Sequence, residues 1–176
     1  LAQSDIGALV LNKEQGGPLF NRVAGMDANF RFGFLSMNAY AARTFSPASA
    51  VPTTGKTYAS GAGFNYQDGN WQANLSASGI GSSFDDQMGF VPRRNSDAIN
   101  GRFGRRFRPL ALSRWLRQTN PHFEFDQFTR QDQGGLESRY GGYHWLLNFE
   151  DGSNAEIGAN TNVEDIAAPF TINSAR

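Results

Sequence analysis

Clustered arginines are the first feature of this sequence that suggests chemistry. Residues 93–117 contain eight arginines and a single acid, Asp97. The positions of Arg102, Arg106 and Arg108 differ by four and by two, so in a β-strand their side chains share one face. Charged side chains gathered inside a pore attract ions of opposite sign and set its selectivity. We therefore expect Arg102, Arg106 and Arg108 to contact a polar interior or its ligand.

Acidic side chains later in the sequence offer these arginines a structural role instead. From residue 118 onward there are nine acids and only three arginines. An internal ladder of ion pairs is therefore the alternative, with the acids Glu124, Asp126, Glu156 and Glu164. Glu124 and Asp126 also share a strand face, which is compatible with the paired carboxylates of a glycoside hydrolase. Sheet lining explains that pair more simply, so we assign no catalytic residue.

Three tryptophans and two histidines are the other side chains that could bind a ligand. Trp71 and Trp145 lie near expected strand ends, where interfacial anchors belong. Trp115 has no such explanation, so it is the candidate for stacking on a sugar ring. His122 and His144 have no other histidine or carboxylate at metal-ligand spacing, and the chain contains no Cys. We therefore expect no metal site and no cofactor.

Strands must position these residues, and the clearest strand signal lies in residues 58–79. From residue 71 to residue 78 apolar and polar side chains alternate without interruption. This period of two is typical of a strand with one apolar and one polar face. Asp68 and Gly69 separate this run from a similar run before it, and an Asp-Gly pair predicts a two-residue hairpin turn with positive φ angles.

The same alternation recurs along the chain and predicts an all-β fold, an antiparallel meander of long strands in one domain (residues 1–176). About nine strands are expected, at residues 5–11, 22–32, 34–45, 58–67, 71–79, 98–108, 123–130, 136–150 and 154–164. Many of them reach ten residues, whereas strands in soluble proteins average ~5 to 6. A tilted strand that crosses a bilayer needs ~9 to 11 residues.

The expected connections are of two kinds, tight turns and long loops, which alternate along the chain. Short turns at one rim and long loops at the other are typical of outer-membrane barrels. The connections at 109–121 and 131–135 fit this alternation poorly. Only 18% of the residues are charged, and there are 14 Arg against two Lys. Lysine normally protects exposed strand edges, so its scarcity disfavours an open sheet in water.

Strands with two different faces have two interpretations. In a soluble β-sandwich or curved sheet the apolar faces pack inward, whereas in a transmembrane barrel they contact lipid. Strand length, the two kinds of turn and aromatic residues near strand ends favour the barrel, with the lipid bilayer as partner. Arg105 falls on the apolar face, so we expect it near a membrane interface. Single-chain barrels usually have even strand numbers, so nine strands indicate part of a larger barrel.

Several phrases resemble one family of bacterial proteins: DIGALVLNKEQ, FNRVAGMDANFRF, ASGAGFNYQDGNWQ, and FDDQMGFVPRRN followed by GRFGRRFRP. They are similar to the C-terminal β-barrel domain of uncharacterised outer-membrane proteins, and GFVPR (residues 89–93) is the most specific phrase. In that family the barrel follows an N-terminal module similar to family 9 carbohydrate-binding domains. The resemblance implies a bacterial outer-membrane location, a longer chain whose last strands would follow PFTI (residues 169–172), and carbohydrate binding or uptake.

We therefore expect an outer-membrane β-barrel segment with a polar, Arg-containing lumen that binds surface carbohydrate or passes solutes. A soluble all-β carbohydrate-binding module is the alternative, and a glycoside hydrolase is less favoured because no catalytic motif can be assigned. The formal net charge is zero, and we expect no nucleic-acid partner.

Overall fold

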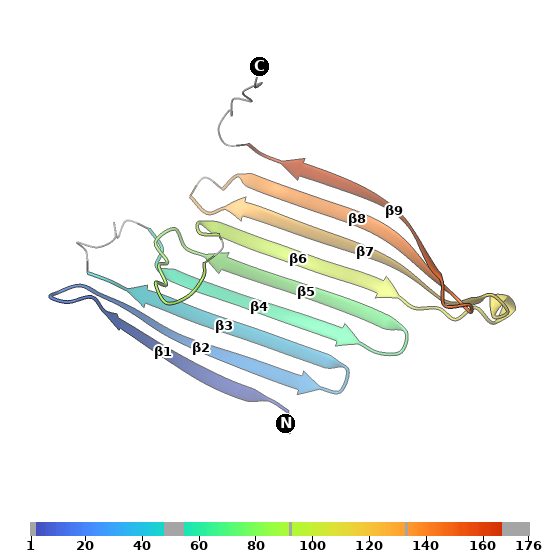
Figure 1. The fold of residues 1–176 in the computed structure, drawn as a ribbon, viewed down its shortest axis with the longest axis horizontal. Coiled ribbons are helices and arrows are strands. Elements are labelled where there is room, and N and C mark those ends of the chain that lie inside the picture. The colour runs from blue at the N-terminus through green and yellow to red at the C-terminus, as the bar shows by residue number, and fades with distance from the viewer. Residues whose placement is uncertain (1–2, 48–54, 92, 133, 167–176) are drawn as a thin grey trace, which may run out of the picture.

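The computed structural model describes residues 3–47, 55–91, 93–132 and 134–166. These residues form one nine-stranded sheet in which each strand pairs antiparallel with the next along the chain (Figure 1). The strands are β1 (Asp5–Glu14), β2 (Phe20–Phe32), β3 (Leu35–Phe45), β4 (Tyr58–Gln67), β5 (Trp71–Ile80), β6 (Ser96–Arg105), β7 (Leu116–Arg130), β8 (Leu136–Phe149) and β9 (Asn154–Glu164). The predicted all-β meander is confirmed; residues 169–172 lie outside the described residues.

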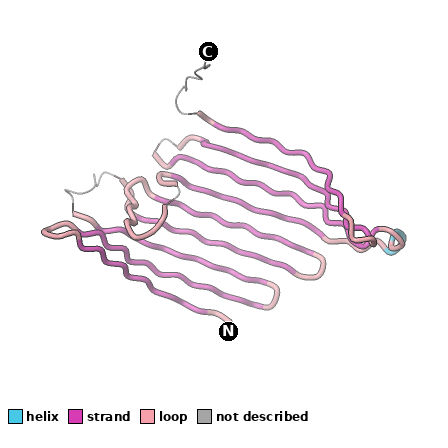
Figure 2. Tube along the Cα trace, in the orientation of Figure 1, coloured by secondary structure: helices cyan, strands magenta, loops and turns pink. Residues whose placement is uncertain are grey.

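Long strands dominate the structure. β1 has 10 residues and β7 has 15. Among the described residues a single 3-10 turn, η1 (Leu110–Leu112), is the only helical element, and it lies in the connection between β6 and β7 (Figure 2). The described part of the chain contains no helix long and apolar enough to cross a membrane.

The connections alternate between two rims of the sheet (Figure 1). The turn rim carries the connections that follow β2, β4, β6 and β8, and the loop rim carries those that follow β1, β3, β5 and β7. At the turn rim, Gly33 and Gly152 adopt positive φ angles of 57° and 87°. Glycine reaches this region without steric cost, which permits these tight turns.

The turn between β4 and β5 differs from the predicted two-residue turn. It spans residues 68–70, and Gly69 does not adopt a positive φ angle. The Asp68 carboxylate explains the difference, because its Oδ1 accepts hydrogen bonds from the backbone N–H groups of Asn70 (2.7 Å) and Trp71 (2.5 Å). An aspartate that bonds backbone groups following it in this way mimics a backbone turn, so the positive φ angle is not required.

Strand β7 also begins earlier than predicted. The sequence indicates an irregular connection up to Pro121, but β7 already starts at Leu116. The Thr119 N–H donates to the Phe107 carbonyl (2.9 Å), on the β6 side of the strand, and residue 121 faces the same side. The continuous pairing of β6 with β7 ends opposite His122. Pro121 therefore lies where its missing N–H breaks no pairing, which is why the strand tolerates it.

One face of the sheet is apolar, and no second layer of the described residues covers it. Side chains that lie opposite one another on neighbouring strands, such as Met37, Phe64 and Leu75, share this face. Large exposed residues on this apolar face include Met26, Met37, Leu75, Phe103, Phe123, Tyr143, Trp145 and Ile157. A sandwich needs a second sheet packed against the first, so the described residues do not form one.

The opposite, polar face is partly covered near the loop rim by residues 81–91, which we call the inward loop (Figure 1). Asn21 on β2 is fully buried beneath it, donating through Nδ2 to the Asp85 carbonyl (2.7 Å) and accepting from the Gln87 N–H (3.3 Å). Phe84 of the loop is only 7% exposed. The inward loop therefore packs against the polar face instead of extending away from the sheet.

We predict that Asp68→Ala lowers the thermal midpoint at neutral pH and that the difference disappears in acid. Hydrogen bonds, first from the Trp71 N–H and then from the Tyr66 hydroxyl, hold the pKa of Asp68 below its usual range. A depressed folded pKa gives stability that is present above the unfolded pKa, about 4, and is lost as the pH falls through the folded pKa.

Circular-dichroism melts of the two proteins at several pH values measure this difference. Asp132→Ala is the control, because Asp132 is exposed at the loop rim and accepts no side-chain hydrogen bond from the described residues. An equal loss in both variants would contradict the proposed role of the turn.

Candidate functional site

Charged and aromatic side chains gather on the polar face of β6 to β9. Arg102 lies opposite Glu124, and His122 lies opposite His144. Residues that lie opposite one another in an antiparallel pair have adjacent side chains on the same face. We call this group the polar cluster; its members are Arg102, His122, Glu124, Tyr140, His144 and Glu156.

A chain of hydrogen bonds connects most of the polar cluster. The Tyr140 hydroxyl donates to Glu124 Oε1 (2.9 Å) and lies 3.1 Å from His144 Nε2. On the other side of the ring, His144 Nδ1 lies 2.6 Å from Glu156 Oε1. The imidazole rings of His122 and His144 are stacked, with centroids 5.2 Å apart and planes inclined by 12°. Two histidines and two carboxylates are thus held together by register.

The contacts of His122 define its tautomer. Its Nδ1 lies 3.2 Å from the Asn120 carbonyl oxygen, which accepts hydrogen bonds only. Its Nε2 lies 3.0 Å from Nη2 of Arg102, which donates only. His122 therefore carries its proton on Nδ1 and presents a lone pair on Nε2. The residue is 5% exposed, so this orientation is held by buried contacts.

Two glycines leave the space that the polar cluster occupies. A Cβ atom added at Gly142 would lie 2.5 Å from the Tyr140 hydroxyl and 2.7 Å from His144 Nε2. A Cβ atom at Gly158, which lies opposite His144, would be 2.7 Å from His144 Nδ1. A Cβ atom at either position would push these side-chain ends aside. Glycine therefore leaves the space in which Tyr140 and His144 meet, and its role here is close approach and not a turn.

A cavity of about 340 Å³ adjoins the polar cluster on the same face. Its polar lining residues are Asn74, Asn100, Arg102, Glu124, Asp126 and Tyr140. Among the described residues, Nε of Arg102 and Oδ1 of Asp126 are buried without a hydrogen-bond partner. Buried polar atoms normally have partners; the cavity itself presents the other polar groups of its lining to a solute.

The structure places the predicted site residues in two different regions. Arg102 lies in the polar cluster, but β6 ends at Arg105, so Arg106 and Arg108 lie in the connection beyond the strand. Phe107, which lies between them, still pairs with Thr119 in the register of β6 and β7, so the shared face of the three arginines stays a prediction beyond Arg105. Trp115 lies at the turn rim, where its ring stacks on Phe149 with centroids 5.9 Å apart.

Arg102 does not join the ion-pair ladder predicted as the alternative. Among the described residues it makes no ion pair within 4.0 Å, and its Nη2 instead lies 3.0 Å from His122 Nε2. Glu124 and Glu156 instead contact His144, at 3.5 Å and 2.6 Å. The acids are therefore engaged by histidine and tyrosine, which leaves Arg102 directed toward the cavity and His122.

Arg105 lies on the apolar face at the end of its strand, and its expected position near a membrane interface stays a prediction. It is the last residue of β6, at the turn rim. Its guanidinium lies over the rings of Trp71 (4.9 Å) and Phe107 (4.5 Å). Cation–π contacts of this kind attract the charge to the aromatic faces.

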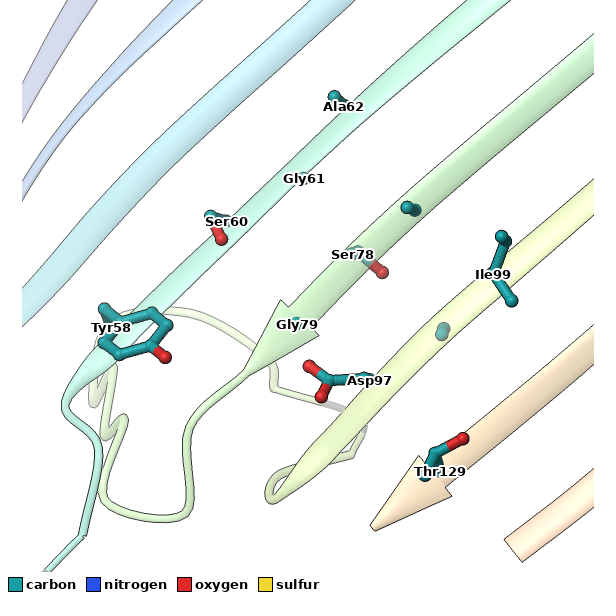
Figure 3. A pocket seen from close by; sticks show the side chains of 11 residues that line it. Tyr58, Ser60, Gly61, Ala62, Ser78, Gly79, Asp97, Ile99 and Thr129 are labelled. Atoms are coloured by element: carbon teal, nitrogen blue, oxygen red, sulfur yellow. The ribbon is translucent and has the colours of Figure 1, made fainter. Parts of the chain in front are cut away.

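A depression of about 600 Å³ lies on the apolar face near the loop rim (Figure 3). Small residues such as Ala62 and Gly79 form its floor, and Tyr58, Asp97 and Ile99 stand around them. Asp97 accepts a hydrogen bond from Gln131 Nε2 (2.6 Å). One charged side chain, Asp97, lines this depression, whereas three charged side chains line the cavity beside the polar cluster.

Sequence reasoning missed the assembly of His122, Tyr140, His144 and Glu156. It considered each histidine alone and found no partner at metal-ligand spacing along the chain. These residues are neighbours on adjacent strands, and their proximity can be known only once the register of the strands is known. The available signal was weak: both histidines occupy the polar positions of their strands, and glycines occupy the neighbouring polar positions 142 and 158.

Comparison of the chain with protein-family models, with curated proteins and with solved structures found no match. The fold and the geometry of the polar face are therefore the basis for any functional conclusion.

We predict that Gly142→Ala destabilises the protein by about 1 to 3 kcal/mol, the usual cost of overpacking. The added methyl group would force Tyr140 and His144 apart and break their hydrogen bonds. Gly141→Ala is the matched control, since its Cβ atom would make only an ordinary 3.4 Å contact with Thr161 on the other face. Denaturant unfolding measures both, and equal stability of the two variants would exclude the close-packing argument.

Proposed function

We propose that this chain forms part of a bacterial outer-membrane β-barrel, with the apolar face toward lipid and the polar face toward the interior. One observation carries the proposal: a single sheet exposes large apolar side chains on one face, and no described residue covers them. Exposed patches of this kind mark contact with a membrane or another protein. The resemblance to barrel domains of outer-membrane proteins agrees with the membrane.

Strand length and the position of aromatic residues support this orientation. Every strand has at least 10 residues, enough for a tilted crossing of ~9 to 11 residues. At the turn rim, Trp71, Trp115 and Phe149 lie close to Arg105 or to one another. Aromatic girdles and cations are expected at a membrane interface.

Closure of the barrel completes the proposal. In the described sheet β1 and β9 each have one unpaired edge. Unpaired backbone groups in lipid cost several kcal/mol each, so a sheet in a membrane must close. We propose that further strands of a longer chain pair with these edges.

The interior suits uncharged or cationic polar solutes better than anions. On the polar face of the strands, the cations are Lys13, Arg31, Arg102 and Arg130, and the acids are Asp5, Asp27, Glu124, Asp126, Glu156 and Glu164. Acids outnumber cations there, so the arginines do not make an anion-attracting lumen. The cavity beside the polar cluster and the inward loop offer contacts to polar solutes such as carbohydrates, and we propose that these are bound or passed.

We predict opposite outcomes for two neighbouring substitutions on β5. Leu75 points to the apolar face and is 43% exposed, whereas the Ser76 hydroxyl donates to Asn100 on the polar face (2.8 Å). Leu75→Arg places a charge in lipid at a cost of about 2 to 4 kcal/mol and should abolish the compact, heat-sensitive band of detergent-extracted protein on a denaturing gel. Ser76→Arg should retain it.

A soluble domain would give the reverse result. If the wild-type protein stays monodisperse without detergent, or if Leu75→Arg improves solubility, the apolar face does not contact lipid. The soluble carbohydrate-binding module would then be the better description.

We predict that the protein in liposomes admits neutral sugars faster than sugar acids of similar size, because acids dominate the strands of the polar face. Liposome swelling measures both rates. Asp126→Asn removes one unpaired carboxylate from the cavity and should reduce the difference between the two entry rates. Asp132→Asn, outside the sheet, should leave that difference unchanged. Equal or faster entry of the sugar acid would contradict an acidic interior.

A further inference from the structure

We propose that His122, His144 and Glu156 bind a divalent transition-metal ion of the zinc type. Each residue offers one ligand atom, and these three atoms lie within 4.8 Å of one another. Imidazole and carboxylate together suit Zn²⁺ and neighbouring ions such as Cu²⁺ and Ni²⁺. This inference depends on the cluster alone, and it holds whether or not the proposed membrane function is correct.

Three adjacent strands hold the donors in register. His122 of β7 and His144 of β8 are directly opposite, and their rings are stacked. Glu156 of β9 reaches His144 Nδ1 at 2.6 Å. In a tetrahedral site with bonds of ~2.0 to 2.2 Å, ligand atoms lie roughly 3.4 Å apart. The two imidazole rings must tilt out of their parallel stack, and Glu156 must move away from His144 Nδ1, to bring the three atoms around one ion.

The protonation of His122 is already that of a metal ligand. Its Nδ1–H donates to the Asn120 carbonyl, which leaves the lone pair on Nε2, where Arg102 now contacts it and an ion would coordinate. Histidines that bind metals commonly donate their second ring N–H to a carbonyl or carboxylate in this way. At His144, the ion would replace the direct contact between Nδ1 and Glu156 Oε1 and take both atoms as ligands.

The surroundings leave room for an ion. Gly158 lies opposite His144, and its missing side chain opens the space beside Nδ1. Glu124 lies 3.5 Å from His144 Nε2 and adds negative charge. Three protein ligands leave the fourth position of a tetrahedral ion to water or to a solute.

Arg102 opposes the ion and provides a sensitive test. Its Nη2 occupies the His122 Nε2 lone pair at 3.0 Å, and its positive charge repels a cation. An ion and Arg102 therefore compete for the same lone pair. Removing the guanidinium should strengthen metal binding, an outcome that a merely structural cluster would not produce.

The test is calorimetric titration of untagged, metal-free protein with Zn²⁺. We expect one ion per chain, an affinity at least 10-fold weaker in His122→Ala and in His144→Ala, and a weaker affinity in Glu156→Gln. Arg102→Met should bind Zn²⁺ several-fold more tightly. Glu164→Gln, on the same face of β9 but outside the cluster, is the matched control and should bind as the wild type does.

A measurement on the wild type keeps the proposal testable if a histidine variant fails to fold. The zinc X-ray absorption spectrum of the loaded protein should show two imidazole ligands. The proposal is overturned if the spectrum shows oxygen ligands alone, if the protein takes up no zinc, or if uptake is the same in wild type and His122→Ala.

Discussion

A single-layer sheet cannot bury its own apolar face, and this constraint governs the rest of the structure. Alternation along nine long strands places side chains such as Met37, Phe64 and Leu75 on one face. Burial of apolar surface is the main favourable term in folding, at roughly 25 cal/mol per Å², and here the described residues leave that surface uncovered. The burial of this apolar face therefore depends on whatever covers it, which is the basis for proposing contact with lipid.

The polar face of the sheet carries the inward loop and the polar cluster. Near the loop rim the inward loop (residues 81–91) buries Asn21 with its hydrogen bonds satisfied. Farther along, β6 to β9 gather histidine, tyrosine and carboxylate side chains. His144, Tyr140 and Glu124 are half-buried and Glu156 is exposed. The pairing of His144 with Glu156 and of Tyr140 with Glu124 holds these side chains together on the polar face, where we propose that a solute or ion binds.

The proposed roles use different parts of this organisation. Contact with lipid depends only on the apolar face and on strand length. Selection of solutes depends on the excess of acids and on the cavity bounded by Arg102 and Asp126. Metal binding depends on the stacked pair His122 and His144. The same strand register positions the residues proposed for solute selection and those proposed for metal binding. A substitution at Gly142 or at another close-packed position should therefore affect both roles.

Much of the fold was determined by the sequence alone, because a period of two needs no tertiary information. The alternation in residues 71–78 and its recurrence predict the number and order of the strands, although β7 is longer than predicted. Backbone details were harder to predict from the sequence. The Asp68 carboxylate closes a turn for which the Asp-Gly pair predicts positive φ angles. Pro121 is tolerated within β7 because the continuous pairing of β7 with β6 ends at His122. The site required tertiary structure throughout. His122, His144 and Glu156 are far apart in sequence, and only the registers of β7, β8 and β9 bring them together, since a slip of one residue would turn each side chain to the opposite face.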